Sequence, residues 1–210
     1  MKRFILFGAP GSGKGTMGER IQRDFGFARI ATGDILRAEI ERGSAEGRQA
    51  RAHMDSGGLV PDELVIEMVR RRLQAGDLDG GYVMDGYPRT LRQAEALSQV
   101  PCDGEKAVFI EVDEEQAVGR LLSRLTCREC GAIYNRANKP PLRPGICDVC
   151  GGAVEPRRDD NEQSVRERFR VYAERTLPVI EYYHRLGVLA RIDGNGPAGP
   201  VYERLRGLIA

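Results

Sequence analysis

Short apolar runs bounded by glycine recur along the chain and alternate with stretches of helical periodicity. Runs of this length are typical of strands that are buried on both faces. Because helical patterns lie between the runs, the sequence predicts an α/β fold with a five-stranded parallel sheet flanked by helices on both faces. The five predicted strands are residues 4–7, 27–31, 81–84, 106–112 and 188–192.

Three helical stretches have recognisable boundaries or breaks. In residues 14–25 apolar side chains recur at every fourth position, which places them on one helix face. Residues 61–73 begin with a proline and two acidic residues, as the first turn of a helix prefers. The long stretch 161–186 contains Pro178. Because proline lacks an N–H group, we expect this helix to be kinked or split there.

Two segments interrupt the alternation of strands and helices. Residues 32–60 hold two short helical patterns and no strand. Residues 123–160 hold four cysteines together with several prolines and glycines. A segment this short has too little apolar material for a core of its own. We therefore expect a small inserted lobe that folds around a metal ion.

The composition narrows the possible partners. The 210 residues are 41% hydrophobic and 30% charged, with a formal net charge of +1. Proteins that bind nucleic acids or membrane surfaces usually carry an excess of positive charge, and this chain has almost none. The apolar run near the N-terminus ends after Phe7, too early for a secretion signal or a membrane span. We expect a cytoplasmic monomer that binds neither nucleic acid nor membrane.

The segment GAPGSGKGT, residues 8–16, lies between a predicted strand and a predicted helix, as a phosphate-binding loop does. Its glycines let backbone N–H groups turn inward, and the N-terminus of the following helix favours an anion. Lys14 can reach the β- and γ-phosphates of a nucleotide. A plain glycine-rich turn is the alternative, but the spacing, the lysine and both flanking elements agree with phosphate binding.

One position of this loop departs from the usual pattern. Most such loops carry a hydroxyl residue directly after the lysine, whereas here Gly15 follows and the hydroxyl comes one position later, at Thr16. We therefore expect Mg²⁺ to be held mainly by nucleotide oxygens and water, with Thr16 and an acidic residue nearby. The loop residues predicted to bind the nucleotide are Gly11, Ser12, Gly13, Lys14, Gly15 and Thr16.

A second group of phosphate-suited side chains follows the second and third predicted strands. TGDILR offers Thr32 and Arg37, and MDGYPRTLRQ offers Asp85, Arg89 and Gln93, whose amide is able to read a base edge. Asp85 ends its strand, where open α/β sheets bind ligands, and an acid there can steer Mg²⁺. Individually, a helix cap, a turn and solvated arginines would explain these residues. Together, beside a phosphate loop, they indicate an acceptor that is itself a phosphate.

Four cysteines in 123–160 form two C-x-x-C pairs separated by sixteen residues, which is a strong metal signal. Four thiolates close a tetrahedral shell, so the predicted ion is structural Zn²⁺, with iron in the same cage as an alternative. Two disulfides or four free thiols would also be compatible with these cysteines. Cys102 stands alone. The predicted metal ligands are Cys127, Cys130, Cys147 and Cys150.

Four motifs, GAPGSGKGT, TGDILR, GLVPDELV and DGYPRTLRQ, occur in an order and spacing that resemble the adenylate kinases. The resemblance covers essentially the whole chain. It implies Mg²⁺-dependent transfer of a phosphoryl group between ATP and AMP to give two ADP. It also implies a P-loop kinase core of residues 1–29, 61–122 and 161–210, an AMP-binding helical lobe of residues 30–60, and a lid of residues 123–160.

The resemblance also implies roles for individual residues. The residues it assigns to catalysis are Lys14, Asp85, Arg89, Arg124, Arg157 and Arg168. Beyond the loop, those it assigns to ATP are Arg120, Arg124, Ile133, Tyr134 and Gly196. Those it assigns to AMP are Thr32, Arg37, Gly58, Leu59, Val60, Gly86, Arg89, Gln93, Arg157 and Arg168. Alternatively, the arginines of the lid pair with Asp159, Asp160 and Glu162, an arrangement that nucleotide binding could exchange for phosphate contacts.

The implied reaction needs no strong base, because an AMP phosphate oxygen is already anionic near neutral pH. This suits a chain whose two histidines, His53 and His184, both fall in helical patterns. Tyr87 stands where the family usually has phenylalanine, a small departure. The alternative functions are a kinase for another nucleoside monophosphate and a zinc-ribbon ATPase acting on nucleic acid. The near-neutral charge and the absence of tryptophan disfavour the second.

Overall fold

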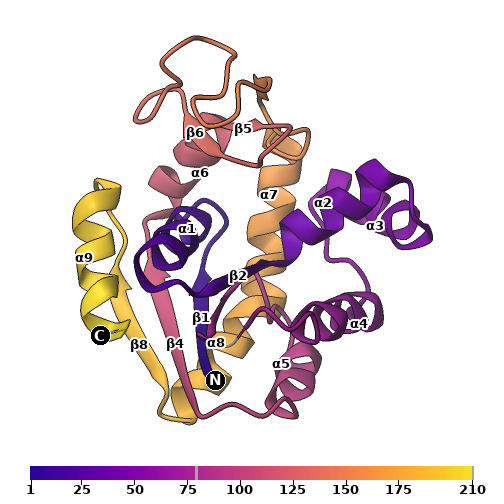
Figure 1. Cartoon of the computed structure of the whole chain (residues 1–210), viewed down its shortest axis with the longest axis vertical. Helices are drawn as coiled ribbons and strands as arrows, with labels where there is room; N and C mark the ends of the chain where they lie inside the picture. The colour runs from indigo at the N-terminus through magenta and orange to yellow at the C-terminus, as the bar shows by residue number, and fades with distance from the viewer. Residues whose placement is uncertain (79, 210) are drawn as a thin grey trace.

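The computed structural model describes residues 1–78 and 80–209. Its main sheet is parallel, in the strand order β2-β3-β1-β4-β8 (Figure 1). Each of the five predicted runs contributes one strand, so the predicted α/β class is confirmed. The strands are β1 (Lys2–Gly8), β2 (Ala28–Ala31), β3 (Tyr82–Asp85), β4 (Gly104–Glu111) and β8 (Leu189–Asp193).

The central strand β1 divides the core into two sides. Successive side chains of a strand point to opposite faces. Ile5 and Phe7 therefore join one buried cluster, while Phe4 and Leu6 join the other. Both sides of the sheet are thus covered, as a parallel sheet requires. The first side is covered by α4 (Asp62–Leu73), α5 (Leu91–Ser98) and α8 (Leu177–Arg185), and the second by α1 (Lys14–Phe25) and α9 (Ala198–Ile209).

The predicted break in the long C-terminal helix is confirmed. The helix α7 (Glu162–Val171) passes into a π-helical turn, Tyr172–Thr176, and then into α8 with Pro178 in its first turn. The proline cannot donate to the preceding turn, and a wider turn accommodates this loss. The π-turn brings the Thr176 hydroxyl within 3.1 Å of the Arg89 carbonyl oxygen, to which it donates.

Residues 123–160, here called the cysteine lobe, form a separate small sheet between α6 (Glu114–Leu122) and α7, at the top of Figure 1. Its strands are antiparallel, in the order β6-β5-β7. Its buried cluster contains only four residues, two of which are cysteines. The strands are β5 (Arg124–Cys127), β6 (Ile133–Asn135) and β7 (Val154–Glu155).

Residues 30–60, here called the helical lobe, carry the two predicted helices, α2 (Thr32–Arg42) and α3 (Ala45–Ser56). This lobe is seated on α7. The Ser164 hydroxyl of α7 donates to the Asp55 carbonyl oxygen at 2.9 Å. Gly57 has φ +83°, and a Cβ there would lie 2.5 Å from the Ser164 carbonyl oxygen. A glycine is therefore required where the lobe meets the helix.

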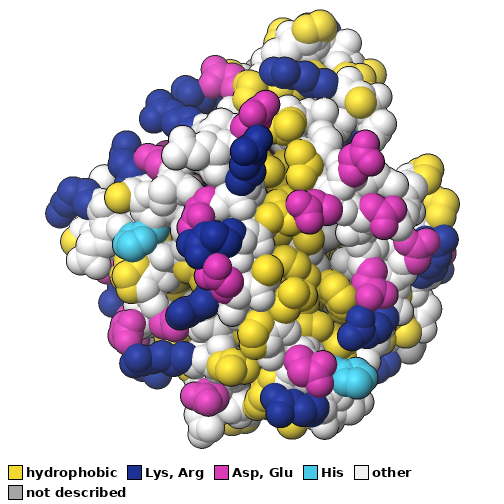
Figure 2. Space-filling view, turned by 180° about the vertical axis from the view of Figure 1, so that it is seen from behind, with side chains coloured by type: hydrophobic (Ala, Val, Ile, Leu, Met, Phe, Trp, Pro, Cys, Tyr) yellow, Lys and Arg dark blue, Asp and Glu magenta, His cyan; other side chains and the backbone are white. Residues whose placement is uncertain are grey.

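The reverse face of the molecule carries a band of hydrophobic side chains along its middle, with basic and acidic side chains on either side (Figure 2). Charges of both signs are mixed on this face, in keeping with the net charge of +1. None of the helices in residues 1–78 and 80–209 combines the length and the apolar character that crossing a membrane requires.

Candidate active site

A cavity of about 1070 Å³ opens at the carboxyl ends of β1, β2 and β3, bounded by the helical lobe and the cysteine lobe. This volume exceeds that of most pockets for a single small molecule. Every residue that the sequence predicted to bind a nucleotide lines it. From the core and the helical lobe these are Gly11, Ser12, Gly13, Lys14, Gly15, Thr16, Thr32, Arg37, Gly58, Leu59, Val60, Asp85, Gly86, Arg89 and Gln93. From the rest of the chain they are Arg120, Arg124, Ile133, Tyr134, Arg157, Arg168 and Gly196.

The phosphate loop has the predicted strand, loop and helix order. Gly11 has φ +83°, and a Cβ there would lie 2.2 Å from the Ala117 carbonyl oxygen, so only glycine fits. The Lys14 ammonium folds back over the loop and donates to the carbonyl oxygens of Gly8 at 2.8 Å and Ala9 at 2.9 Å. Burial lowers the pKa of Lys14 to about 7, because the cavity wall replaces water around the charge.

Gly15 leaves room for the cysteine lobe. A Cβ at this position would lie 3.0 Å from the Ile133 Cδ1 atom of β6 and 3.5 Å from an Asp85 carboxylate oxygen. The first distance is shorter than an ordinary carbon–carbon contact. The lobe therefore reaches the loop at the position where the usual hydroxyl is missing.

The cavity carries a surplus of positive charge. Burial is the main cause that lowers the pKa of Arg89 to about 10 and that of Arg157 to about 9, and neighbouring arginines add to it. Both groups stay protonated at neutral pH. The shifts therefore show positive charge that lacks compensation, which bound phosphate would supply. The charged residues lining the cavity are Lys14, Arg29, Arg37, Arg89, Arg120, Arg124, Lys139, Arg157 and Arg168, with Asp34, Asp85 and Asp159 as the acids.

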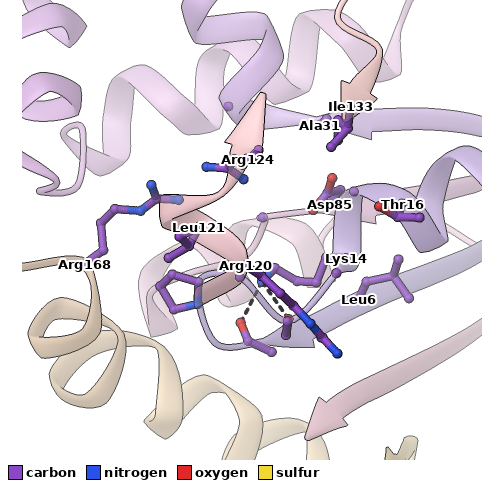
Figure 3. A pocket seen from close by; sticks show the side chains of 18 of the residues that line it. Leu6, Lys14, Thr16, Ala31, Asp85, Arg120, Leu121, Arg124, Ile133 and Arg168 are labelled. Atoms are coloured by element: carbon purple, nitrogen blue, oxygen red, sulfur yellow. Dashed lines mark hydrogen bonds between the residues drawn. The ribbon is translucent and has the colours of Figure 1, made fainter. Parts of the chain in front are cut away.

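Two of the predicted catalytic arginines share one buried carboxylate. Arg124 of β5 donates to both oxygens of Asp160, at 2.8 and 2.6 Å, and Arg168 of α7 donates to it at 2.9 Å. The Asp160 side chain is only 2% exposed. Arg168 also pairs with Asp159. The predicted pairing of these arginines with Asp159 and Asp160 is thus present in the structure, and Figure 3 shows both arginines at the cavity.

Arg89 is positioned by its own turn. Its Nε donates to the Gly86 carbonyl oxygen at 2.8 Å, and the Thr32 hydroxyl donates to the same oxygen at 2.9 Å. Gly86 has φ +77°, and a Cβ there would lie 2.7 Å from the Arg89 guanidinium. With Thr176 bound to its carbonyl oxygen, Arg89 is held on both its backbone and its side chain. Such a group pays little further entropy when it binds a phosphate.

Arg29 is a residue of the site that the sequence analysis missed. It lies on β2 and pairs with Asp85 at 2.8 Å and with Asp34 at 3.0 Å. Its guanidinium lies against α1, where a Cβ on Gly18 would come within 3.1 Å of its Nε. The sequence did contain a signal for Arg29, because it is a charged residue inside the apolar run FARIA. A cation in a buried strand needs a partner of opposite charge.

Arg120 closes the opposite end of the cavity. From α6 it donates to the carbonyl oxygens of Gly194 at 3.1 Å and Gly196 at 3.0 Å, in the loop after β8. The Gln116 side chain accepts from the same nitrogen at 3.0 Å. Arg120 and Gly196, which were predicted separately to contact ATP, are thus joined by a hydrogen bond. Neither His53 nor His184 lines the cavity, and both are exposed.

A family model described as adenylate kinase matches residues 6–188, most of the chain. The chain belongs to the adenylate kinase family. Proteins named adenylate kinase are similar to it over almost their whole length. That of Archaeoglobus fulgidus is 42% identical over 209 residues, covering 98% of this chain and 96% of the relative. That of Syntrophotalea carbinolica is 45% identical over 207 residues, covering 97% and 96%.

A third relative, the adenylate kinase of Caldicellulosiruptor saccharolyticus, is 44% identical over 196 residues, covering 91% of each chain. The resemblance inferred from the four motifs is therefore confirmed. Adenylate kinases generally use Mg²⁺ with ATP. In this member Thr16 and Asp85, the two residues expected near Mg²⁺, both line the cavity.

The four cysteines of this adenylate kinase family member form a cluster suited to a metal ion. Their sulfur atoms all lie within 4.8 Å of one another. The Cys127–Cys150 and Cys130–Cys147 sulfur pairs are 3.5 and 3.6 Å apart. A tetrahedral Zn²⁺ with bonds of about 2.3 Å separates its sulfur ligands by about 3.8 Å. The donor set and its spacing therefore fit a closed four-thiolate site.

Tyr134 supports this cluster from inside the cysteine lobe. Its side chain is 3% exposed, and its hydroxyl lies 3.4 Å from the Cys147 sulfur while accepting from the Asp148 N–H at 2.8 Å. The hydrogen bond from Tyr134 lowers the pKa of the Cys147 thiol to about 6, which favours the thiolate that a metal needs. Since the hydroxyl is occupied here, any contact of Tyr134 with a nucleotide involves another part of the residue.

Proposed function

We propose that this chain transfers the γ-phosphoryl group of ATP to AMP, reversibly and with Mg²⁺, to give two molecules of ADP. The observation that carries the proposal is the single cavity that joins the phosphate loop to the cluster around Arg37 and Arg89. One donor phosphate and one acceptor phosphate can then meet within a single cationic site. Family membership and the names of the relatives support the same activity.

The chemistry follows from alignment and charge. An AMP phosphate oxygen attacks the γ-phosphorus in line, the bond to the β–γ bridging oxygen breaks, and ADP leaves. Lys14 and the loop N–H groups bind the β- and γ-phosphates, while Arg37 and Arg89 hold the AMP phosphate. Arg124, Arg157 and Arg168 neutralise the charge that spreads over the transferred group. Mg²⁺, when bound with ATP, neutralises further charge, with Asp85 and Thr16 near it.

The three parts of the chain take separate tasks in this proposal. Residues 1–29, 61–122 and 161–210 form the core that holds the phosphate loop. The helical lobe, residues 30–60, binds AMP, with Gly58–Val60 and the Gln93 amide of the core beside the base. The cysteine lobe, residues 123–160, closes over ATP through Ile133 and its arginines and excludes water, which would otherwise hydrolyse ATP. Gly196 and Arg120 lie at the proposed adenine end of the ATP site.

We further propose that the four cysteines hold Zn²⁺ as a structural ion, with iron as the alternative. The ion has no open position for substrate, so its task is to fold the cysteine lobe. Thiolates persist in a reducing compartment, which supports the cytoplasm as the location. We propose a monomer that needs neither nucleic acid nor a membrane.

The decisive experiment measures ADP formation from ATP and AMP with Mg²⁺. Lys14→Ala is expected to lower the rate by on the order of 10²–10³-fold, the effect of removing one preorganised charge donor. Lys2→Ala, on an exposed lysine of β1, is the matched control and keeps the parental rate. The proposal would be refuted if the parent formed no ADP, or if the Lys14→Ala variant formed it at the parental rate.

A panel of AMP, GMP, UMP and CMP at equal concentration separates the proposal from the nearest alternative. A preference for AMP supports adenylate kinase activity, whereas a preference for another acceptor makes the chain a kinase for that monophosphate. ATP hydrolysis that responds to single-stranded DNA and not to any monophosphate would instead support a nucleic-acid-dependent ATPase.

A further inference from the structure

The Gln93 side chain is held by two opposite hydrogen bonds in the wall of the cavity. It is 2% exposed and lies in the first turn of α5. Its Nε2 donates to an Asp62 carboxylate oxygen at 2.8 Å, and its Oε1 accepts from the Arg89 backbone N–H at 2.8 Å. An amide carries two N–H groups and two lone pairs. One N–H and one lone pair of Gln93 therefore remain for a ligand.

These two partners permit only one orientation of the amide. If the amide were rotated by half a turn, its oxygen would face the Asp62 carboxylate and its NH₂ group would face the Arg89 N–H. Both contacts would then be repulsive, and both buried groups would lose their hydrogen bonds. The charge of Asp62 makes this preference strong, because a carboxylate accepts and never donates.

Asp62 is itself fixed in place. It is the first residue of α4, where the helix end favours a carboxylate. The Thr90 hydroxyl donates to the same Asp62 oxygen at 3.0 Å and accepts from the Gln93 backbone N–H at 3.2 Å. Asp62, Thr90 and Gln93 thus form a closed ring of hydrogen bonds, anchored on two helices and largely shielded from solvent.

We propose that Asp62 is the positioning residue that sets base selectivity at the acceptor site. It fixes Gln93 so that one N–H and one carbonyl lone pair face the base in a set order. Adenine presents a complementary edge, a ring-nitrogen acceptor beside the N6 donor. Hypoxanthine presents the reverse, an N1–H donor beside the O6 acceptor. A rotated amide would match hypoxanthine, and the Asp62 carboxylate, together with the Arg89 N–H, prevents that rotation. This inference rests on the proposed function, in which Gln93 lies at the AMP base.

The test is Asp62→Asn, which keeps the size of the side chain but can donate as well as accept. The kcat/KM ratio for AMP over inosine monophosphate is expected to fall by about tenfold, because each base loses or gains roughly one matched hydrogen bond. If Asp62 had only a structural role, the variant would lower kcat/KM for AMP and for inosine monophosphate by the same factor, and their ratio would stay unchanged. The control is Glu63→Gln on the neighbouring acid, which is exposed and pairs with Arg92 at the surface. It is expected to keep the parental ratio.

A second pair of variants keeps the test valid if Asp62→Asn unfolds. Thr90→Val removes the hydroxyl that holds Asp62 and is expected to lower the same ratio by a smaller factor. Thr90→Ser retains the hydroxyl and is expected to keep the parental ratio. A parent that prefers AMP, together with variants whose ratios stay within twofold of it, overturns this inference alone. A parent with no activity toward any monophosphate overturns the proposed function itself.

Discussion

The main sheet and the cysteine lobe are ordered by different forces. On either side of the main sheet lies a large cluster of buried apolar side chains, with Ile5 and Val108 among those with no exposed surface. The buried cluster of the cysteine lobe holds four residues, and two of the lobe's larger apolar side chains, Leu142 and Val149, are 88% and 75% exposed. Burial of apolar surface stabilises the main sheet. The cysteine lobe buries too little apolar surface to be stabilised in the same way.

The closure that we propose needs a rigid region and a movable region in one chain, and this difference in apolar burial supports it. If the lobe depended on the hydrophobic core of the sheet, it could not shift without breaking that core. In the proposed function, a metal ion held by the four cysteines orders the lobe locally. The lobe would then open and close over the cavity as a body while the sheet stays unchanged.

Loss of the metal is expected to have the largest effect on this contrast. Metal-free protein, or the Cys127→Ser variant, should lose the order of the cysteine lobe, because thiolate ligation stabilises small zinc domains by on the order of 10 kcal/mol. Hydrogen exchange should become fast in β5 and β6 and stay slow in β1 and β4. Cys102→Ser, at the cysteine outside the cluster, is the control. Slow exchange in β5 of the Cys127→Ser variant would contradict the comparison.

Ile5→Ala tests the other region. Removing a fully buried side chain from the central strand is expected to lower the free energy of unfolding by about 2–5 kcal/mol. Leu142→Ala in the cysteine lobe, at an exposed side chain, should change it by less than about 0.5 kcal/mol. Urea denaturation measures both values. Equal losses in the two variants would mean that the lobe, too, relies on apolar burial.

Asp160→Asn acts where the two regions meet. The variant leaves Arg124 and Arg168 without their shared carboxylate, which should cost about 2 kcal/mol of stability. This is less than the 3–5 kcal/mol of a fully buried pair, because both arginines are partly exposed to the cavity. A non-hydrolysable ATP analogue should then raise the melting temperature of the variant more than that of the parent, since its phosphates replace the lost charge. An equal rise in both proteins would show that these arginines do not contact phosphate.

The smallest predicted effect concerns the protonation state of Lys14. With a pKa of about 7 in the folded protein and an ordinary value of 10.5, Lys14 is largely neutral at pH 8 when folded and charged when unfolded. The unfolded state binds more protons between these values, so this group makes stability fall as pH drops through that window and rise as pH increases across it. Phosphate binding restores the charge. Titration calorimetry at pH 8 in two buffers of different ionisation heat should therefore show uptake of close to one proton with ATP.

Lys14→Met should abolish this uptake, and identical heats in both buffers for the parent would contradict it. The measurement sharpens the comparison because it links the two regions. The phosphate loop follows β1 of the main sheet. Burial is the main cause of the low Lys14 pKa, but Arg124 of the cysteine lobe adds to it, so disorder of that lobe should reduce the proton uptake.

The five strands could be predicted from the sequence because their signal is local. Each is a short apolar run, and the break near Pro178 follows from the chemistry of one residue. The cluster of four cysteines was predictable for a similar reason, since the spacing of each C-x-x-C pair sets its geometry. Contacts between distant segments could not be obtained in this way. Arg29 meets Asp85 across 56 positions.

The same limit applies to Gln93. The sequence indicated an amide able to read a base edge, but half of its hydrogen-bonding capacity is taken by Asp62 and Arg89. Asp62 had a complete local explanation as the first residue of a helix. Its second role depends on how α4 and α5 pack together, and no pattern within either segment encodes that packing.

Gly15 has a consequence for how such a chain can change over time. A serine there would restore the usual loop pattern, but its side chain would occupy the space that Ile133 fills when the cysteine lobe lies against the loop. The two positions share one volume, although they lie 118 positions apart in the sequence. A mutation at either one is then neutral or harmful according to the residue at the other. Lineages that carry a hydroxyl residue at position 15 are expected to carry a smaller side chain at position 133.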